Sequence, residues 1–536
     1  MASQSSQEQP REASATETTP LIPNGFRDRR SDILPRNKLL IVIPALSLVH
    51  FTSFIDQTAI STTLPSIASA LKAGSSISWV GTSFLTTSTC IQLINGRLSD
   101  IFGRKTCLIT SLVVMGIGNL LSGFSQTAGQ LYVTRALSGF GAGALNALVQ
   151  ITTSDITRLD QRGYYFGILG VAVALGNGLG PVIGGLFAES ISWRWAFWFI
   201  CPLTVMAVTL LAFVLPGISA ADNTLRNLKM LDWIGVLTSM IAIILILIPI
   251  SQGGSSMPWS SPIVISMLTF GTSLFFAFII FEWGLVELPI LPMRLFRYNK
   301  STNILLATNL LIGWVFWGNL FYLPLYFQNV RGYSPTTAGS LVLPMVISHG
   351  VTSGLSGLLM SLTGHYKPVI SIGAGLWATG AILKSSYGKA TSFPLFCLTG
   401  ILEGIGVGFL VGLLAGTDNA DRAVITGLRN FLRDMGGSIG ITVSGAILNN
   451  VMQAGLKGRF SSEIISQLTS STFALSNLKL SSEEKELILM VYARGIRFVF
   501  CSFGVLTMIM FMASLCLHDY GLVQKNQLQD GDNDEQ

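Results

Sequence analysis

NGRLSDIFGRK, residues 95–105, is a short charged stretch between two long apolar ones. Glycine permits backbone conformations that other residues avoid, so the stretch is expected to turn tightly at its two glycines. The glycines are Gly96 and Gly103, and Asp100 lies among the basic side chains of Arg97, Arg104 and Lys105. The stretch therefore predicts a compact turn between two helices, with one carboxylate flanked by cations.

The composition around this turn is that of a membrane protein. Half of the 536 residues are hydrophobic and only 11% are charged, and the mean hydropathy is +0.58. These values lie outside the usual range of a soluble domain. About 20 apolar residues are needed for a helix to cross the bilayer. Because the chain has many such stretches, we expect an all-α polytopic membrane protein that contacts the lipid bilayer.

Fourteen stretches are long and apolar enough to be counted as spans, and an even number places both termini on one side of the membrane. The predicted spans are residues 39–61, 77–96, 106–125, 129–151, 164–188, 195–215, 233–250, 262–283, 302–328, 336–361, 369–387, 393–416, 424–449 and 497–517.

The loops between these spans differ in charge. Basic residues are expected on the cytosolic side, and one set of alternate loops is rich in them: Arg97, Arg104, Lys105, Arg158, Arg162, Arg226, Lys229, Arg294, Arg297, Lys300, Lys367 and Arg422. The opposite set includes two segments without any, 122–130 and 251–261, but also Lys72, Arg194, Arg331, Lys384 and Lys389. Both termini are therefore predicted to be cytosolic. The net charge of +6 comes largely from these loops, and no nucleic-acid partner is expected.

The predicted organisation has five parts. They are a disordered cytosolic tail (1–37), a six-helix half (38–216), two extra helices with linkers (217–300), a second six-helix half (301–518) and a cytosolic tail (519–536). The second half contains a long non-cytosolic segment at about 450–496, whose patterns suit one or two short amphipathic helices on the membrane surface.

Three motifs resemble those of the major facilitator superfamily. The order G-R-L-S-D-x-x-G-R-K resembles the family's loop signature, in which an acidic residue and basic ones hold the cytosolic face closed. By resemblance, Asp100 and Arg104 take those roles here. LYVTRALSGFGAGA at 131–144 resembles the second motif, whose arginine, here Arg135, is associated with proton transfer. LGNGLGPVIGGLF at 175–187 resembles the antiporter motif of span five. Its matching residues are Gly176, Gly180, Pro181, Gly184 and Gly185.

The resemblance implies two six-helix halves around a central cavity, with the extra helices between them, a 6+2+6 arrangement. The chain resembles the fourteen-span drug:proton antiporter branch and fungal vacuolar basic amino acid transporters. In that branch an acidic residue of span one, matched here by Asp56, is tied to handling of protons or cationic substrates.

Charged residues inside spans are costly and are functional candidates by default. Asp56, Arg135 and Glu403 are the candidates for substrate or proton coupling. Each has a structural alternative: Asp56 could pair with a basic residue of a neighbouring span, Arg135 needs a carboxylate, a substrate or water, and Glu403 could be a partner of a basic side chain. Arg433 and Asp434 are better explained as a structural pair, and the lone His50 and His349 as core residues.

ETTPLI at 17–22 fits the acidic dileucine pattern that cargo adaptors read when they sort proteins to lysosomes and vacuoles, with Glu17, Leu21 and Ile22 as the signal. The sequence thus predicts a proton-coupled antiporter that moves basic amino acids from the cytosol into the vacuole. A plasma-membrane multidrug:proton antiporter and a non-transporting nutrient receptor are the alternatives. No enzyme motif, metal cluster or cofactor-binding motif stands out, so neither enzymatic activity nor a cofactor is expected.

Overall fold

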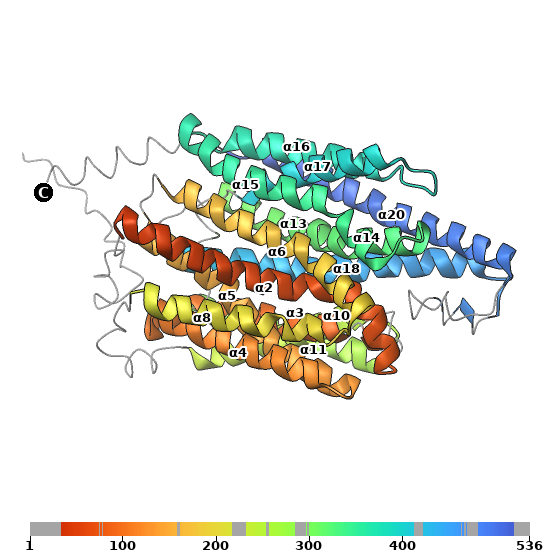
Figure 1. Ribbon diagram of the computed structural model, residues 1–536, viewed down its shortest axis with the longest axis horizontal. Helices are drawn as coiled ribbons and strands as arrows, with labels where there is room; N and C mark the ends of the chain where they lie inside the picture. Colours follow the sequence, from red (N-terminus) through yellow and green to blue (C-terminus); the bar gives the residue numbers. More distant parts are fainter. Residues whose placement is uncertain are drawn as a thin grey trace, which may run out of the picture.

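The computed structural model describes residues 34–73, 76–77, 79–157, 161–216, 232–252, 257–284, 296, 300–411, 422–461, 464–465, 468 and 481–518. Helices account for nearly all of this part of the chain, and its only β-type pairing is a single bridge between Lys457 and Phe460. The all-α prediction is confirmed. Figure 1 shows the long helices running side by side along one common direction.

The helices of residues 34–216 pack around their own apolar core, which includes Leu46, Leu112, Leu145 and Leu211. Their bounds are α2 (Arg36–Ala70), α3 (Trp79–Phe102), α4 (Arg104–Phe124), α5 (Ala128–Ile156), α6 (Arg162–Ser190), α7 (Trp195–Trp198) and α8 (Ile200–Val214). We call this group the N-terminal half.

A second apolar core belongs almost entirely to residues 300–518 and includes Val315, Trp377, Phe500 and Phe503. The helices around it are α13 (Lys300–Leu325) with the π-helical turn η2 (Tyr326–Val330), α14 (Pro335–Ser340), α15 (Leu343–Thr363), α16 (Lys367–Lys384), α17 (Phe393–Val411), α18 (Arg422–Leu456) and α20 (Ser482–Leu515). We call this group the C-terminal half.

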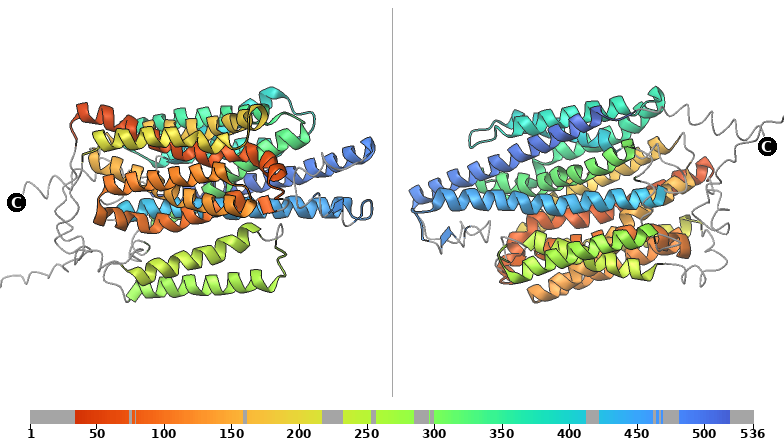
Figure 2. Two further views of the ribbon diagram at one scale, coloured as in Figure 1. Left: turned by 60° about the horizontal axis from the view of Figure 1, so that its bottom comes forward. Right: turned by 180° about the vertical axis from the view of Figure 1, so that it is seen from behind.

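Two further helices, α10 (Trp233–Gln252) and α11 (Pro262–Gly284), form a hairpin on one flank of the bundle. In the left view of Figure 2 they lie below the other helices. Val236 and Leu247 of α10 share an apolar cluster with Cys90 of α3 and Leu428 of α18. The hairpin therefore packs on both halves.

The two halves meet where glycines allow close approach. A Cβ added to Gly167 of α6 would lie 2.5 Å from the Cα of Gly354 on α15, and one added to Gly427 of α18 would lie 2.9 Å from the Gln92 carbonyl oxygen on α3. Small residues let membrane helices pack backbone to backbone. The α6–α15 and α3–α18 contacts are thus the seam between the halves.

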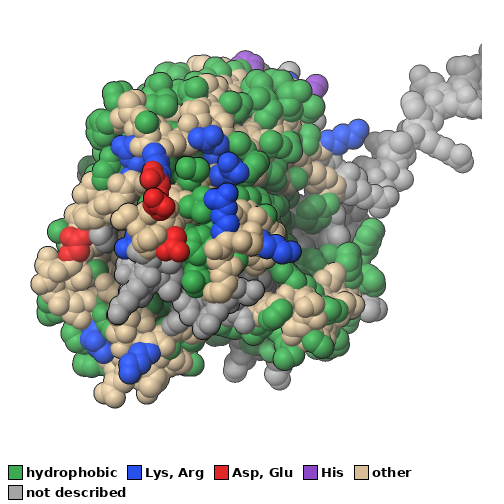
Figure 3. All heavy atoms as spheres, turned by 90° about the vertical axis from the view of Figure 1, so that its right-hand side faces the viewer, with side chains coloured by type: hydrophobic (Ala, Val, Ile, Leu, Met, Phe, Trp, Pro, Cys, Tyr) green, Lys and Arg blue, Asp and Glu red, His purple; other side chains and the backbone are tan. Residues whose placement is uncertain are grey.

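Eleven helices of the described part are long and apolar enough to cross a membrane. The more polar α3, α5 and α16 are not among them, although they run alongside the others. Large apolar side chains such as Phe213, Ile280 and Leu362 are exposed on the flanks, as expected for a surface that faces lipid. Figure 3 shows one end of the bundle, where charged side chains cross the middle of the end face.

Two long helices extend into residues 450–496, the segment predicted to lie on the non-cytosolic side with one or two short helices. Helix α18 continues to Leu456 and α20 already begins at Ser482. Ser481 caps α20 by accepting a hydrogen bond from the backbone N–H of Glu484, whose side chain accepts one from the Ser481 N–H. This capping box fixes the start of α20, so the amphipathic stretch after Ser482 is the first part of that long helix.

Candidate functional site

The turn between α3 and α4 holds a compact ion-pair network. Gly103 ends α3 and starts α4 with a φ of +86°, in the region that favours glycine. Arg104 pairs with Asp100 at 2.6 Å and with Asp155, at the end of α5, at 3.0 Å. The predicted tight turn at Gly103 is confirmed.

The other residues of this turn have more local roles. Gly96 lies inside α3, so the turn predicted there was wrong; its carbonyl oxygen accepts a hydrogen bond from Arg104 at 3.4 Å. Lys105 donates to the carbonyl oxygen of Ala212 in α8. Arg97 lies in the last two turns of α3. The network ties α3, α4, α5 and α8 together at one end of the bundle.

The glycines at residues 175–187 form a packing face on α6. A Cβ on Gly184 would lie 2.0 Å from the Ala59 carbonyl oxygen of α2, and one on Gly176 would lie 2.9 Å from the Phe51 carbonyl oxygen. The hydroxyl of Thr62 on α2 donates to the carbonyl oxygen of Pro181 at 2.9 Å. These residues hold α2 and α6 at backbone contact.

The same motif also reaches the other half. A Cβ on Gly185 would lie 3.2 Å from the backbone nitrogen of Thr336 on α14, whereas Gly180 faces the hydroxyl of Thr58 on α2. Glu189, at the end of α6, accepts a hydrogen bond from the Thr336 N–H. The motif is therefore part of the seam between the halves as well as of the α2–α6 contact.

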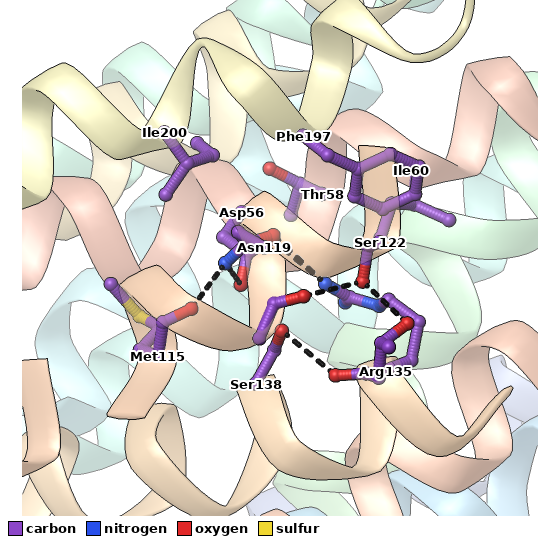
Figure 4. A network of polar contacts seen from close by, with 12 residues as sticks. Asp56, Thr58, Ile60, Met115, Asn119, Ser122, Arg135, Ser138, Phe197 and Ile200 are labelled. Atoms are coloured by element: carbon purple, nitrogen blue, oxygen red, sulfur yellow. Dashed lines mark hydrogen bonds and ion pairs between the residues drawn. The ribbon is translucent and has the colours of Figure 1, made fainter. Parts of the chain in front are cut away.

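Asp56 and Arg135 form a buried triad with Asn119 of α4, which Figure 4 shows from close by. The Asp56 Oδ1 lies 2.9 Å from the Arg135 Nη1, and both side chains are 1% exposed. Asn119 donates to the other carboxylate oxygen, Oδ2, at 3.1 Å, and its own Oδ1 lies 3.4 Å from the Arg135 Nη1. The guanidinium group also stacks 4.3 Å above the ring of Phe84. Each oxygen of Asp56 thus has a partner, and the structure contains the ion pair that the structural alternative requires.

Glu403 belongs to a second buried triad, with Lys384 and Asn319. The Lys384 Nζ lies 2.5 Å from the Glu403 Oε2 and donates to the Asn319 Oδ1 at 2.6 Å. Asn319 donates to the same Oε2 at 3.0 Å. Lys384 was expected in a non-cytosolic loop, but it ends α16 and is 1% exposed. The Glu403 Oε1 is buried and has no hydrogen-bond partner.

A third polar group lies between the halves. On α18, Arg429 donates to the Gln150 Oε1 of α5 at 3.0 Å. Asp434 accepts a hydrogen bond at 2.6 Å from Gln92 of α3. Arg433 lies 3.7 Å from the adjacent Asp434 carboxylate. We call these five residues, with His50 and His349, the interface cluster.

Arg433 is at the centre of the interface cluster. It acts electrostatically on His50 of α2, on His349 of α15 and on Arg429, one helical turn away. Several buried polar atoms here have no hydrogen-bond partner: the Nη2 of Arg433, the Nδ1 of His50 and both ring nitrogens of His349. Buried polar groups in proteins are nearly always hydrogen-bonded. Unpartnered polar atoms at a seam between two halves, among them the Arg433 Nη2 donor, are therefore a candidate binding site.

Sequence reasoning found part of these sites. Arg433 and Asp434 do lie beside each other, as predicted, but their place among residues from both halves had no sequence signal. The pairing of Lys384 with Glu403 had no sequence signal either. Lys384 is the last residue of α16, so in the sequence it looks like a lysine of the loop that follows. The sorting signal predicted at 17–22 lies outside the described residues.

Comparisons with known proteins agree with the helical architecture. A sequence profile of the Major Facilitator Superfamily matches residues 46–441. Citrate exporter 1 of Yarrowia lipolytica is 36% identical over 519 residues, which cover 94% of this chain and 77% of that protein. The MFS-type transporter clz4 of Cochliobolus lunatus is 35% identical, with 89% and 86% covered, and the efflux pump dotC of Dothistroma septosporum is 31% identical, with 80% and 74% covered.

Solved structures give the same picture of the fold. The human organic anion transporter MFSD10 (TETRAN) superposes with a TM-score of 0.56 at 14% identity, covering 90% of this chain and all of that one. An inward-facing bacterial homolog of the human lysosomal transporter Spinster superposes with a TM-score of 0.58 at 14% identity, with 90% and 98% covered.

Proposed function

Because the chain belongs to the major facilitator superfamily and is a membrane transporter, we propose that it exports small organic anions in exchange for protons. The interface cluster is the observation that carries this proposal. Its two arginines outnumber its one carboxylate, Asp434, and Arg433 keeps a buried Nη2 without a hydrogen-bond partner. A carboxylate is the complement of such a group, since guanidinium and carboxylate form strong charge-assisted hydrogen bonds.

The anion class is also supported by a relative. The Yarrowia lipolytica protein that is 36% identical over nearly the whole chain is named as a citrate exporter. If the membrane is negative on the cytosolic side, each negative charge that leaves the cytosol is favoured by about 2.3 kcal/mol per 100 mV. Proton entry moves charge in the same favourable direction.

The basic amino acid substrate suggested by resemblance has less support. A cationic substrate needs available carboxylates, but Asp56 is paired with Arg135 and Glu403 with Lys384. Drug efflux remains the alternative, because other relatives are named as efflux pumps.

The location in the vacuolar membrane and the cytosolic position of both termini remain part of the proposal. Imaging of the tagged protein, with and without Leu21→Ala, tests the sorting signal.

Transport by the purified chain in proteoliposomes tests the substrate class. We expect efflux of labelled citrate or malate, but not of labelled lysine or arginine. Replacing Arg433 by Gln removes charge-assisted hydrogen bonds worth about 1.5–3 kcal/mol, so citrate affinity should fall roughly ten- to hundredfold. Arg433→Lys, which keeps the charge, is the matched control and should lose less. Lysine transport without citrate transport would refute the proposal.

A further inference from the structure

The two buried triads occupy equivalent places in the two halves. Asp56, Asn119 and Arg135 lie on the first, third and fourth long helices of the N-terminal half, α2, α4 and α5. Asn319, Lys384 and Glu403 lie on the first, third and fourth long helices of the C-terminal half, α13, α16 and α17. Each triad consists of one carboxylate, one cation and one amide.

The chemical types are exchanged between the equivalent helices. The first helix carries the carboxylate in one half and the amide in the other, and the fourth carries the arginine in one and the glutamate in the other. The third carries the amide of Asn119 and the ammonium group of Lys384. The two triads are therefore similar in composition but differ in what each can do with a proton.

We infer that the exchangeable proton of the transport cycle binds to Glu403 and not to Asp56. The two carboxylates differ in their hydrogen bonds. Asp56 accepts from Arg135 on one oxygen and from Asn119 on the other, so a proton added to either oxygen would have to share it with an existing donor. Glu403 accepts both of its donors on Oε2, which leaves the buried Oε1 open to a proton.

The cations differ as well. An arginine stays protonated in proteins, whereas a buried lysine can lose its proton. In the step we infer, a hydronium ion on the non-cytosolic side breaks one of its O–H bonds and transfers that proton to the Glu403 Oε1, so that water is left behind and the carboxylate loses its negative charge. Lys384 keeps its two present acceptors, Glu403 Oε2 and Asn319 Oδ1. Breaking the same O–H bond on the cytosolic side releases the proton and restores the neutral triad.

In the described part of the chain, the elements packed around Glu403 bring these groups near it. Lys384 comes from α16, and Tyr387, just after α16, lies within electrostatic range of Glu403. From α15, the backbone at His349 packs against Gly404, next to Glu403. From α20, the apolar ring of Phe500 lies 5.2 Å from the ammonium group, and α13 contributes the amide of Asn319. Lys384 is therefore the cation that sets the charge of this site.

Infrared difference spectra of the reconstituted full-length protein test the inference without any transport. Acidification should produce a carboxylic acid C=O band that disappears in Glu403→Gln and shifts in Glu403→Asp, which keeps the carboxyl group. Asp56→Glu is the matched control and should leave the band in place. Absence of the band from the wild-type protein, its persistence in Glu403→Gln, or its shift in Asp56→Glu would each overturn the assignment.

A transport assay separates this inference from the proposed function on which it rests. With citrate as the probe, Glu403→Gln should retain citrate–citrate exchange at equal pH but lose the dependence of net efflux on a pH gradient. Wild-type protein that carries no citrate refutes the proposed function, while the infrared result still decides the proton site. Gradient-dependent efflux that survives in Glu403→Gln refutes the proton site alone.

Discussion

Replacing Asp56 by Asn would test whether the N-terminal triad is structural. The substitution preserves the shape of the side chain but leaves the Arg135 guanidinium, 1% exposed and 2.9 Å from the lost oxygen, without its carboxylate. Removing one partner of a buried ion pair typically costs about 3–5 kcal/mol. The stack on Phe84 remains but does not neutralise the charge. We therefore expect the free energy of unfolding to fall by about 3–5 kcal/mol.

The control is the same substitution in an exposed pair. Asp155 is 36% exposed, and its partner Arg104 keeps a second carboxylate, Asp100, so Asp155→Asn should cost at most about 1 kcal/mol. Reversible unfolding of the purified proteins in mixed micelles measures both values. The double variant Asp56→Asn/Arg135→Gln removes the orphaned charge and should be more stable than Asp56→Asn alone. An Asp56→Asn protein as stable as wild type, but without transport, would refute this reasoning and restore Asp56 as the coupling residue.

Three further outcomes follow from contacts in the structure. Gly184→Ala should lower the free energy of unfolding of the purified protein by about 1–3 kcal/mol or more, because the new Cβ would lie 2.0 Å from a backbone oxygen. The control Gly81→Ala, whose Cβ meets nothing within 4 Å, should change it little. Equal melting temperatures of the two variants would contradict the packing role of Gly184. Arg104→Gln removes both ion pairs at the α3–α4 turn and should speed the labelling of cysteines introduced at that end of the seam. Unchanged labelling rates would argue against the predicted role of this turn as a latch. His349→Gln should weaken citrate binding in an equilibrium assay, and wild-type affinity would remove His349 from the site.

The sequence predicted those features that depend on local pattern. Long apolar stretches require helices in a membrane, because the bilayer core offers no water to satisfy backbone groups. The glycine at position 103 predicted a turn, and its positive φ confirms it. The number of spans stays a prediction, since α3, α5 and α16 are more polar than an ordinary lipid-facing helix.

Sequence reasoning also selected Asp56, Arg135 and Glu403, because any charge inside a span is unusual. It favoured a coupling role for Asp56 and Arg135 and left Glu403 open, but it could not identify the partner of any of them. Their partners lie far away in the chain, 79 residues apart for Asp56 and Arg135, and Lys384 had been placed in a loop. Helix packing decides which charges meet, and the hydropathy of a stretch contains no information about which helices are its neighbours.

The amino-acid sequence by itself thus determined the class of the protein, its helical architecture and its list of unusual charges, because these follow from the energetics of burial in lipid. Only the tertiary structure decided the environment of each charge. Packing α2, α4 and α5 together gives both oxygens of Asp56 a donor, whereas packing α13, α16 and α17 leaves one oxygen of Glu403 without any. It also brings Arg433 within electrostatic range of both His50 on α2 and His349 on α15, because residues so far apart in the chain come together only where the two halves pack.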